Sequence, residues 1–385
     1  MALLKKSIWS MSVIVAAIAA YMLLPIDNKY KAVTDVNSQS NEAAVERVRL
    51  LPGEQFIQSH MINENGTLRT YLLPKESKDP QTAAGHDALS ESMGFWLQYA
   101  LEKGDPALFR QNAEIVKTSF MKPDGWIAWK VGPTNTSATT NALVDDLRIA
   151  YSLYSAGAKW QDAEFKKTAD SITKSVVSKQ VVNGTFRDFY DMDKKWPSNV
   201  ITLSYLDATA LTSLYEQSKI SEGLYQKTKT FMIDLPLQNG FYPFNYHVDE
   251  ERFEFHDQVN LLDQLFVEYS RAKFGQKDSE FWAFLKEAFQ NDHVLYGKYD
   301  IASKQRAVEY ESPSVYGLAI LCALEHNDSE LAKDLYYRMI RFQTLNPASE
   351  YYGGYIDYRQ TDTHIFDNLV PLLAERKLYN ARILQ

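Results

Sequence analysis

Two carboxylate side chains lie in sequence surroundings that favour opposite protonation states. Glu91 is the only charged residue between Ala88 and Leu101, and most of its neighbours are apolar or aromatic. Apolar surroundings disfavour the charged form of a carboxyl group and raise its pKa, as a general acid at neutral pH requires. The alternative is a glutamate that simply stabilises the first turn of a helix through the helix dipole.

Asp257 stands at the start of a helix that the sequence predicts over residues 257–273. An aspartate at this position accepts backbone N–H groups, which favours its ionised form; ordinary helix capping is therefore the alternative to a catalytic role. In glycoside hydrolysis the acid role belongs to a carboxyl group that holds a proton, and the base role to a second carboxyl group that lacks one. If the reaction inverts the anomeric centre, we expect the two carboxyl groups to be about 6.5–9.5 Å apart.

Further polar and aromatic residues are candidates for contact with sugar rings. Asp145 and Asp146 lie in a predicted helix over 139–157, where one of them should face inward, unless both are solvated beside Arg148. Aromatic faces can stack on the C–H faces of sugars, although large rings also fill protein cores. The stacking candidates are Trp126, Trp129, Trp196 and Tyr242.

Helices must position these residues, because apolar spacings of three and four residues recur from residue 53 onward. The expected helices cover residues 53–61, 87–101, 106–121, 139–157, 160–178, 203–217, 221–233, 257–273, 279–290, 312–326, 328–343 and 363–378. Strand signals are limited to Leu68–Leu73 and a hairpin around Asn183-Gly184.

The predicted helices alternate between apolar and amphipathic character. The segment 312–326 is apolar on all sides, whereas 328–343 carries a charged stripe. Helices that are apolar all round are buried, and striped helices lie at the surface. The alternation therefore predicts two concentric rings of helices. We expect an all-α fold, an (α/α)6 barrel with a few short strands in its loops. A helical solenoid is the alternative, but no fixed sequence period is present. Long loops should gather at one end of the barrel.

The amino-terminal residues differ from the rest of the chain. Lys5 and Lys6 precede an uncharged run from Ser7 to Leu24, which predicts a signal or membrane anchor over 1–24 with the remainder outside the cytoplasm. Residues 25–52 are polar and are expected to be a linker, and 53–385 a single domain. The predicted location is therefore extracytoplasmic, either membrane-anchored or secreted at a bacterial cell surface.

Composition excludes several functions. The 385 residues include 41 Lys and Arg against 49 Asp and Glu, a net charge of −8, which argues against nucleic acid as a partner. The single Cys322 excludes a disulfide framework and a cysteine-rich zinc site. The proposed chemistry needs no metal or cofactor. We expect a monomer whose partners are a polysaccharide and, through the N-terminal segment, a membrane.

Several motifs resemble those of the family 8 glycoside hydrolases. Residues Ala142–Trp160 follow the family signature Ala–Ser/Thr–Asp–Ala/Gly–Asp and its continuation, with Val144 at the first Asp and Asp146 at the second. Ser90-Glu91 is similar to the family's general-acid segment, and His256–Asn260 to its Tyr-Asp-Ala-Ile-Arg general-base segment. Thr202–Leu206 resembles a Pro-Ser-Tyr-Phe segment, whose Tyr, here Tyr205, helps to hold the attacking water.

The resemblance implies an inverting, endo-acting hydrolase of a β-linked polysaccharide, built on an (α/α)6 barrel. Glu91 would be the general acid, Asp257 the general base, and Asp146 or Asp145 a sugar ligand. The chain looks most like divergent, membrane-associated members found with bacterial exopolysaccharide genes, which suggests a role in biofilm polysaccharide. Two alternatives remain open: a non-catalytic glycan-binding or assembly subunit, favoured by the departures at Val144, His256 and Asn260, and a polysaccharide lyase.

Overall fold

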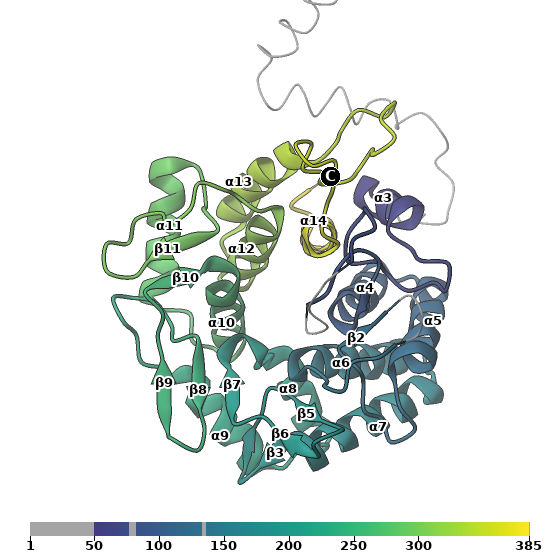
Figure 1. Ribbon diagram of the computed structural model, residues 1–385. Coiled ribbons are helices and arrows are strands. Elements are labelled where there is room, and N and C mark those ends of the chain that lie inside the picture. The colour runs from purple at the N-terminus through teal and green to yellow at the C-terminus, as the bar shows by residue number, and fades with distance from the viewer. Residues whose placement is uncertain (1–49, 77–81, 133–135, 385) are drawn as a thin grey trace, which may run out of the picture. The chain divides into compact units, whose positions relative to one another are not determined.

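Six helices form a closed inner ring in the part of the chain that the computed structural model describes, residues 50–76, 82–132 and 136–384. Figure 1 shows their arrangement. Each inner helix packs against the next, and the last packs against the first. The inner helices are α4 (Ser90–Lys103), α6 (Leu143–Lys159), α8 (Ala208–Glu216), α10 (Leu261–Lys273), α12 (Pro313–Glu325) and α14 (Phe366–Asn380).

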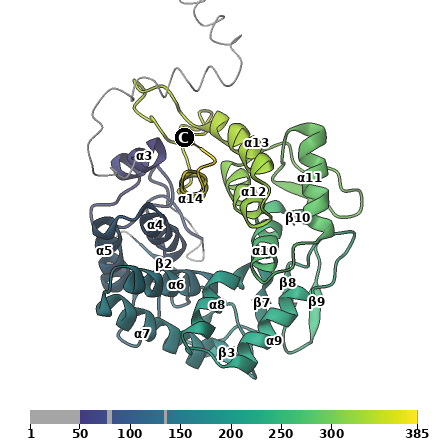
Figure 2. The ribbon, with the colours of Figure 1, turned by 180° about the vertical axis from the view of Figure 1, so that it is seen from behind.

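Six further helices surround this ring (Figure 2). They are α3 (Pro52–His60), α5 (Pro106–Ile115), α7 (Ala163–Gln180), α9 (Glu222–Ile233), α11 (Glu280–Asp292) and α13 (Ser329–Met339). A π-helical turn, Val116–Phe120, extends α5, and 3₁₀ turns occupy Leu203–Tyr205 and Ile340–Phe342. The predicted (α/α)6 barrel is confirmed.

The pattern of apolar residues explains which helices lie inside. In α12 ten of the thirteen residues are buried, whereas in α13 the buried residues form one stripe of four, Ala332, Leu335, Tyr336 and Met339. Several outer helices begin at an aspartate or serine that accepts backbone N–H groups, as Asp162 does for α7 and Ser279 for α11. These local signals agree with the global arrangement.

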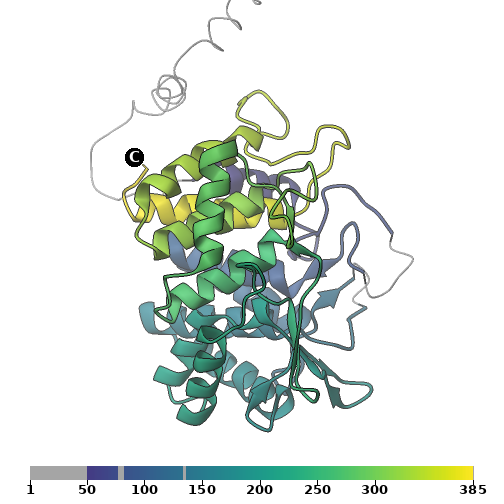
Figure 3. The same cartoon turned by 90° about the vertical axis from the view of Figure 1, so that its left-hand side faces the viewer.

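Short antiparallel strands precede several inner helices. The pairs are β1 (Ala88–Leu89) with β2 (Lys130–Val131), β3 (Val181–Val182) with β4 (Thr185–Phe186), β5 (Tyr190–Asp191) with β6 (Trp196–Pro197), and β10 (Gln258–Asn260) with β11 (Lys298–Asp300). A three-stranded sheet joins β7 (Val200–Thr202), β8 (Asn245–His247) and β9 (Arg252–Glu254). The strands and long loops gather at one end of the barrel (Figure 3).

Two strand predictions had different outcomes. The hairpin at Asn183-Gly184 is confirmed, and both residues have positive φ angles, of 53° and 68°, as a two-residue hairpin turn requires. The strand predicted over Leu68–Leu73 is wrong. This segment forms only isolated bridges, Ile62 with Leu68 and Tyr71 with His364, because no continuous partner strand lies beside it.

The predicted start of the helix at Asp257 is also wrong. Residues 258–260 pair with β11, and α10 begins only at Leu261, with the Asn260 side chain accepting the Leu262 N–H. At the amino-terminal side of the domain, α3 begins at Pro52, one residue before the expected domain start. Within the described residues no helix is long and apolar enough to cross a membrane, and the predicted anchor over 1–24 lies outside them.

Candidate active site

A cavity of about 1100 Å³ opens at the end of the barrel where the inner helices begin. Its walls come from the first turns of four of these helices, through Glu91 of α4, Asp263 of α10, Val315 of α12 and Asp367 of α14. Long loops complete the walls, as the loop lengths predicted. Helix N-termini stabilise negative charge, so their convergence explains why carboxylates can gather here.

Glu91 is half-buried in the wall of this cavity. Burial raises the pKa of the Glu91 carboxyl to about 7, the Asp145 carboxylate contributes to the increase, and the Arg148 guanidinium opposes it. Desolvation thus outweighs the effect of the first helical turn. A carboxyl that keeps its proton near neutral pH and faces an open cavity has the properties of a general acid.

Asp145 lies next to Glu91, whereas Asp146 turns away from it. Asp145 is buried and accepts a hydrogen bond of 2.7 Å from the Ser90 hydroxyl and one of 3.1 Å from the Arg148 guanidinium. Asp146 is also buried, but accepts its hydrogen bond from the Asn141 amide, at 2.6 Å. Of this acidic pair, the structure brings Asp145 to the general-acid candidate.

Tyr205 lies among the carboxylates of the site. Burial raises the pKa of its hydroxyl, and so do the carboxylates of Asp145, Asp188, Glu91 and Asp263, in that order. The hydroxyl is therefore neutral at all relevant pH values and can both donate and accept a hydrogen bond. Tyr205 is not among the residues that line the cavity of Glu91, and its contact with the water or the scissile sugar stays a prediction.

Asp263 is a carboxylate of this site that the sequence analysis missed. It lies in the first turn of α10, lines the same cavity as Glu91, and accepts a 3.2 Å hydrogen bond from the Ser204 hydroxyl. Burial raises the pKa of Asp263, while Ser204 and His256 oppose the increase. The pattern Asn260-x-x-Asp263, a cap residue followed three positions later by an acid, is the signal that could have located it.

Asp257, in contrast, is exposed and does not line the cavity that holds Glu91. It precedes β10, and its backbone carbonyl accepts the Ile301 N–H. Its predicted role as general base therefore has no support from the lining of this cavity. The reason is the strand pairing of residues 258–260, which moves the start of α10 away from Asp257 and makes Asp263 the first-turn acid.

The four stacking candidates do not line this cavity. Trp126 and Tyr242 are 2% and 1% exposed, and the Tyr242 hydroxyl donates to Glu268, so both belong to the core. Trp129 is half-buried, and Trp196 is 46% exposed. The aromatic residues that do line the cavity are Tyr71, Phe266, Tyr310, Phe342, Tyr355 and Phe366.

No group of three or more histidine, cysteine or acidic side chains is arranged for a metal ion in the part of the chain that the structure describes. A glutamate with a pKa raised to about 7, in the wall of an open cavity of an (α/α)6 barrel, meets the requirement of a glycoside hydrolase for a general acid.

Comparison with known proteins gives the family. The model of glycosyl hydrolases family 8 matches residues 15–218, and the chain belongs to this family. The Bacillus subtilis (strain 168) protein named "Putative lipoprotein YdaJ" is 37% identical over 352 residues, which cover 91% of this chain and 93% of that protein.

Solved structures share the fold. A protein described as a novel alpha-amylase from Clostridium perfringens is 26% identical with a TM-score of 0.77, and the match covers 84% of this chain and 96% of that one. PssZ from Listeria monocytogenes is 24% identical with a TM-score of 0.68, covering 85% and 96%. The chain is a divergent family 8 glycoside hydrolase of the type that YdaJ and PssZ represent.

Proposed function

We propose that this hydrolase acts outside the cell on a bacterial polysaccharide, cleaves within the chain and inverts the anomeric centre. Glu91 is the general acid and Asp263 the general base. The observation that carries the proposal is that Glu91, with a pKa of about 7, shares one open cavity with a second carboxylate from a different inner helix. Glu91 protonates the glycosidic oxygen, and Asp263 takes a proton from water on the opposite face of the sugar.

Asp263 replaces Asp257 in this proposal for two reasons. Asp263 lines the cavity, while Asp257 does not. Asp263 is also one of the carboxylates that act on the Tyr205 hydroxyl, together with Glu91. In this proposal Tyr205 orients the attacking water, because its neutral hydroxyl can donate to one oxygen while accepting from another.

The linkage that is cleaved has two candidates. The family resemblance favours a β-linked exopolysaccharide. An α-linked glucan is the second candidate, because the Clostridium perfringens structure described as an alpha-amylase matches this chain with a TM-score of 0.77. At the cell surface, attachment through the N-terminal segment would keep the enzyme next to the polymer, and the name of the YdaJ relative supports a surface location.

Product analysis on a substrate panel tests this proposal. Purified enzyme is incubated with bacterial exopolysaccharides, amylose and a soluble β-glucan, and reducing ends are counted while NMR follows the anomeric configuration. We expect new reducing ends of inverted configuration from one class of polymer. Retention of configuration, or binding without release of reducing ends, would contradict the inverting mechanism or the hydrolase, respectively. An unsaturated product that absorbs in the ultraviolet would indicate a lyase.

The pH profile of the variant Asp145→Asn tests the electrostatics of Glu91. Activity requires protonated Glu91, so it is lost as pH rises through the Glu91 pKa of about 7. The Asp145 carboxylate raises this pKa and Arg148 lowers it, so removing the carboxylate moves the basic limb of log kcat to lower pH. Asp146→Asn, one residue along and equally buried, is the matched control and should leave the limb in place. If the basic limb of the Asp145→Asn profile lies at the same pH as in the wild type, the assignment of Glu91 as the general acid is contradicted.

A further inference from the structure

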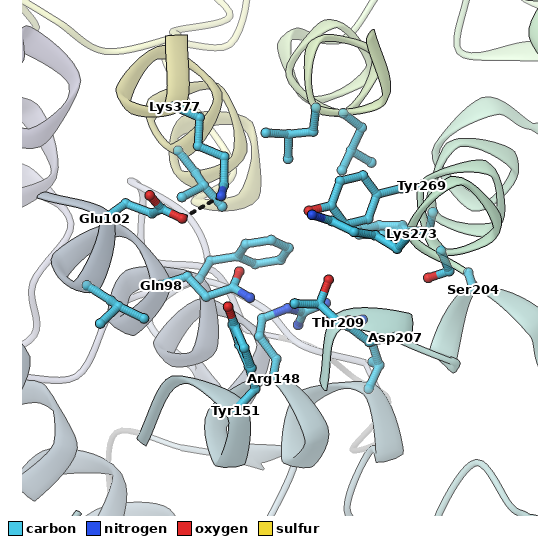
Figure 4. Close-up of a pocket in the computed structure, with 18 residues that line it drawn as sticks. Gln98, Glu102, Arg148, Tyr151, Ser204, Asp207, Thr209, Tyr269, Lys273 and Lys377 are labelled. Carbon is cyan, nitrogen blue, oxygen red and sulfur yellow. Dashed lines mark hydrogen bonds and ion pairs between the residues drawn. The ribbon is translucent and has the colours of Figure 1, made fainter. Parts of the chain in front are cut away.

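A second cavity lies between the inner helices, and Figure 4 shows the residues that line it. Its volume is about 90 Å³, and most of its lining comes from the middle and C-terminal parts of the inner helices. Three phenylalanines, Phe95, Phe266 and Phe366, are in mutual contact near the first turns of α4, α10 and α14, and Phe266 lines both cavities. This aromatic layer separates the second cavity from the cavity that holds Glu91.

Arg148 lies at this layer, with its side chain tightly confined. It lines the second cavity, is 3% exposed, and its guanidinium carbon lies 4.0 Å from the centre of the Phe95 ring. Gly94 leaves the room for it, since a Cβ atom at position 94 would lie 3.1 Å from the Arg148 Cδ. A buried charge held between an aromatic face and a glycine has little freedom to move.

The guanidinium is connected to Glu91 through two side chains. It donates a 3.1 Å hydrogen bond to one oxygen of Asp145, and the other oxygen of Asp145 accepts a 2.7 Å hydrogen bond from Ser90. Ser90 precedes Glu91, and its backbone N–H donates to the Trp129 carbonyl at 3.0 Å. Both oxygens of Asp145 are therefore fixed, and with them the first turn of α4 that carries Glu91.

We propose that Arg148 is a positioning residue for hydrolysis: from the second cavity it holds Asp145 against Ser90, and so fixes Glu91 in the wall of the active site. This inference rests on the proposed role of Glu91. Arg148 does not touch the substrate, because it lies beneath the aromatic layer. A displacement of about 1 Å in a catalytic group can reduce the rate about 100-fold, so the loss should appear in kcat rather than in KM.

The second cavity allows a direct test by chemical rescue. Arg148→Ala leaves a space next to this cavity, which a free guanidinium ion can enter. We expect kcat of the variant to fall about 100-fold with little change in KM, and millimolar guanidinium chloride to restore much of it. Urea, a neutral molecule of the same shape, should not restore activity. Because Asp145 would otherwise remain a buried unpaired charge, the added cation has a defined place to bind.

A matched variant separates positioning from simple destabilisation. Arg271 is equally buried and donates to the carbonyls of Met232 and Ile233, away from the site. Arg271→Ala should lower the unfolding temperature without a rescue of kcat by guanidinium. Wild-type kcat in Arg148→Ala, or a low kcat that guanidinium restores no better than urea, would overturn the inference.

Two further measurements keep the result interpretable. If Arg148→Ala does not fold, Arg148→Met decides: it keeps much of the side-chain volume but removes the charge and the donor to Asp145, so kcat should fall while the variant stays folded, whereas wild-type kcat would reject the role. If Glu91→Gln retains full activity, the proposed function fails. If Glu91→Gln is inactive while Arg148→Ala is fully active, only the inference about Arg148 fails.

Discussion

Glu91→Gln is expected to reduce kcat on the natural polysaccharide by about 10²–10⁴-fold, the usual contribution of a general acid. Glutamine has the same shape but cannot transfer a proton to the departing oxygen, so substrate binding should be retained. Reducing-end release measures the rate, and calorimetric titration with an oligosaccharide measures the affinity. An aryl glycoside with an acidic phenol needs no protonation, so the variant should cleave it at a much smaller disadvantage.

Glu309→Gln is the matched control, because Glu309 lines the same cavity but its side chain is 79% exposed and paired with Arg306. It should remain within a few-fold of the wild type. Equal losses in both variants would mean that general electrostatics of the cavity, and not proton transfer from Glu91, determine the rate. Unchanged turnover in Glu91→Gln would reject the acid assignment.

Asp263→Asn is expected to cause a loss of similar size, about 10²–10⁴-fold in kcat, because the attacking water then lacks a base. Asp257→Asn should behave like the wild type, since Asp257 is exposed and outside the cavity. Azide, a nucleophile that needs no deprotonation, should restore bond cleavage in Asp263→Asn. It attacks the anomeric carbon, Glu91 protonates the departing oxygen, and a glycosyl azide of inverted configuration forms.

The pH profile provides a second criterion for Asp263. A base must be ionised, and the pKa of Asp263 is raised by burial, so the acidic limb of the wild-type profile should lie above the range of an ordinary aspartate. Together with the basic limb at about 7 from Glu91, this predicts a narrow bell-shaped profile. The opposite result, an inactive Asp257→Asn beside an active Asp263→Asn, would return the base role to Asp257.

The barrel itself was predictable because its signals are local. Apolar and striped helices alternate along the chain, and this periodicity alone gave two rings. The direction of the Glu91 pKa shift was also predictable, because apolar neighbours in the sequence indicate burial, and burial is the main cause of the increase. The hairpin at Asn183-Gly184 followed from two residues that readily adopt positive φ.

The remaining features depend on contacts between distant segments, which a single sequence does not display. The start of α10 is set by the pairing of residues 258–260 with 298–300, and this pairing places Asp263 rather than Asp257 in the first turn of α10, where it lines the cavity of Glu91. Tyr242 was expected to stack on a sugar, but its ring packs against Phe281 of α11 and its hydroxyl meets Glu268. Which rings of a loop turn inward depends on the neighbouring helices.

The ring of inner helices is completed by its last member. Helix α14 packs between α12 and α4, and Lys377 and Asn380 bind Glu102 near the end of the helix that carries Glu91. During synthesis on the ribosome, Glu102 in the helix of Glu91 emerges 275 residues before its partner Lys377. A nascent or C-terminally truncated chain therefore has an open barrel and exposed apolar surface, and depends on chaperones or rapid completion to avoid aggregation.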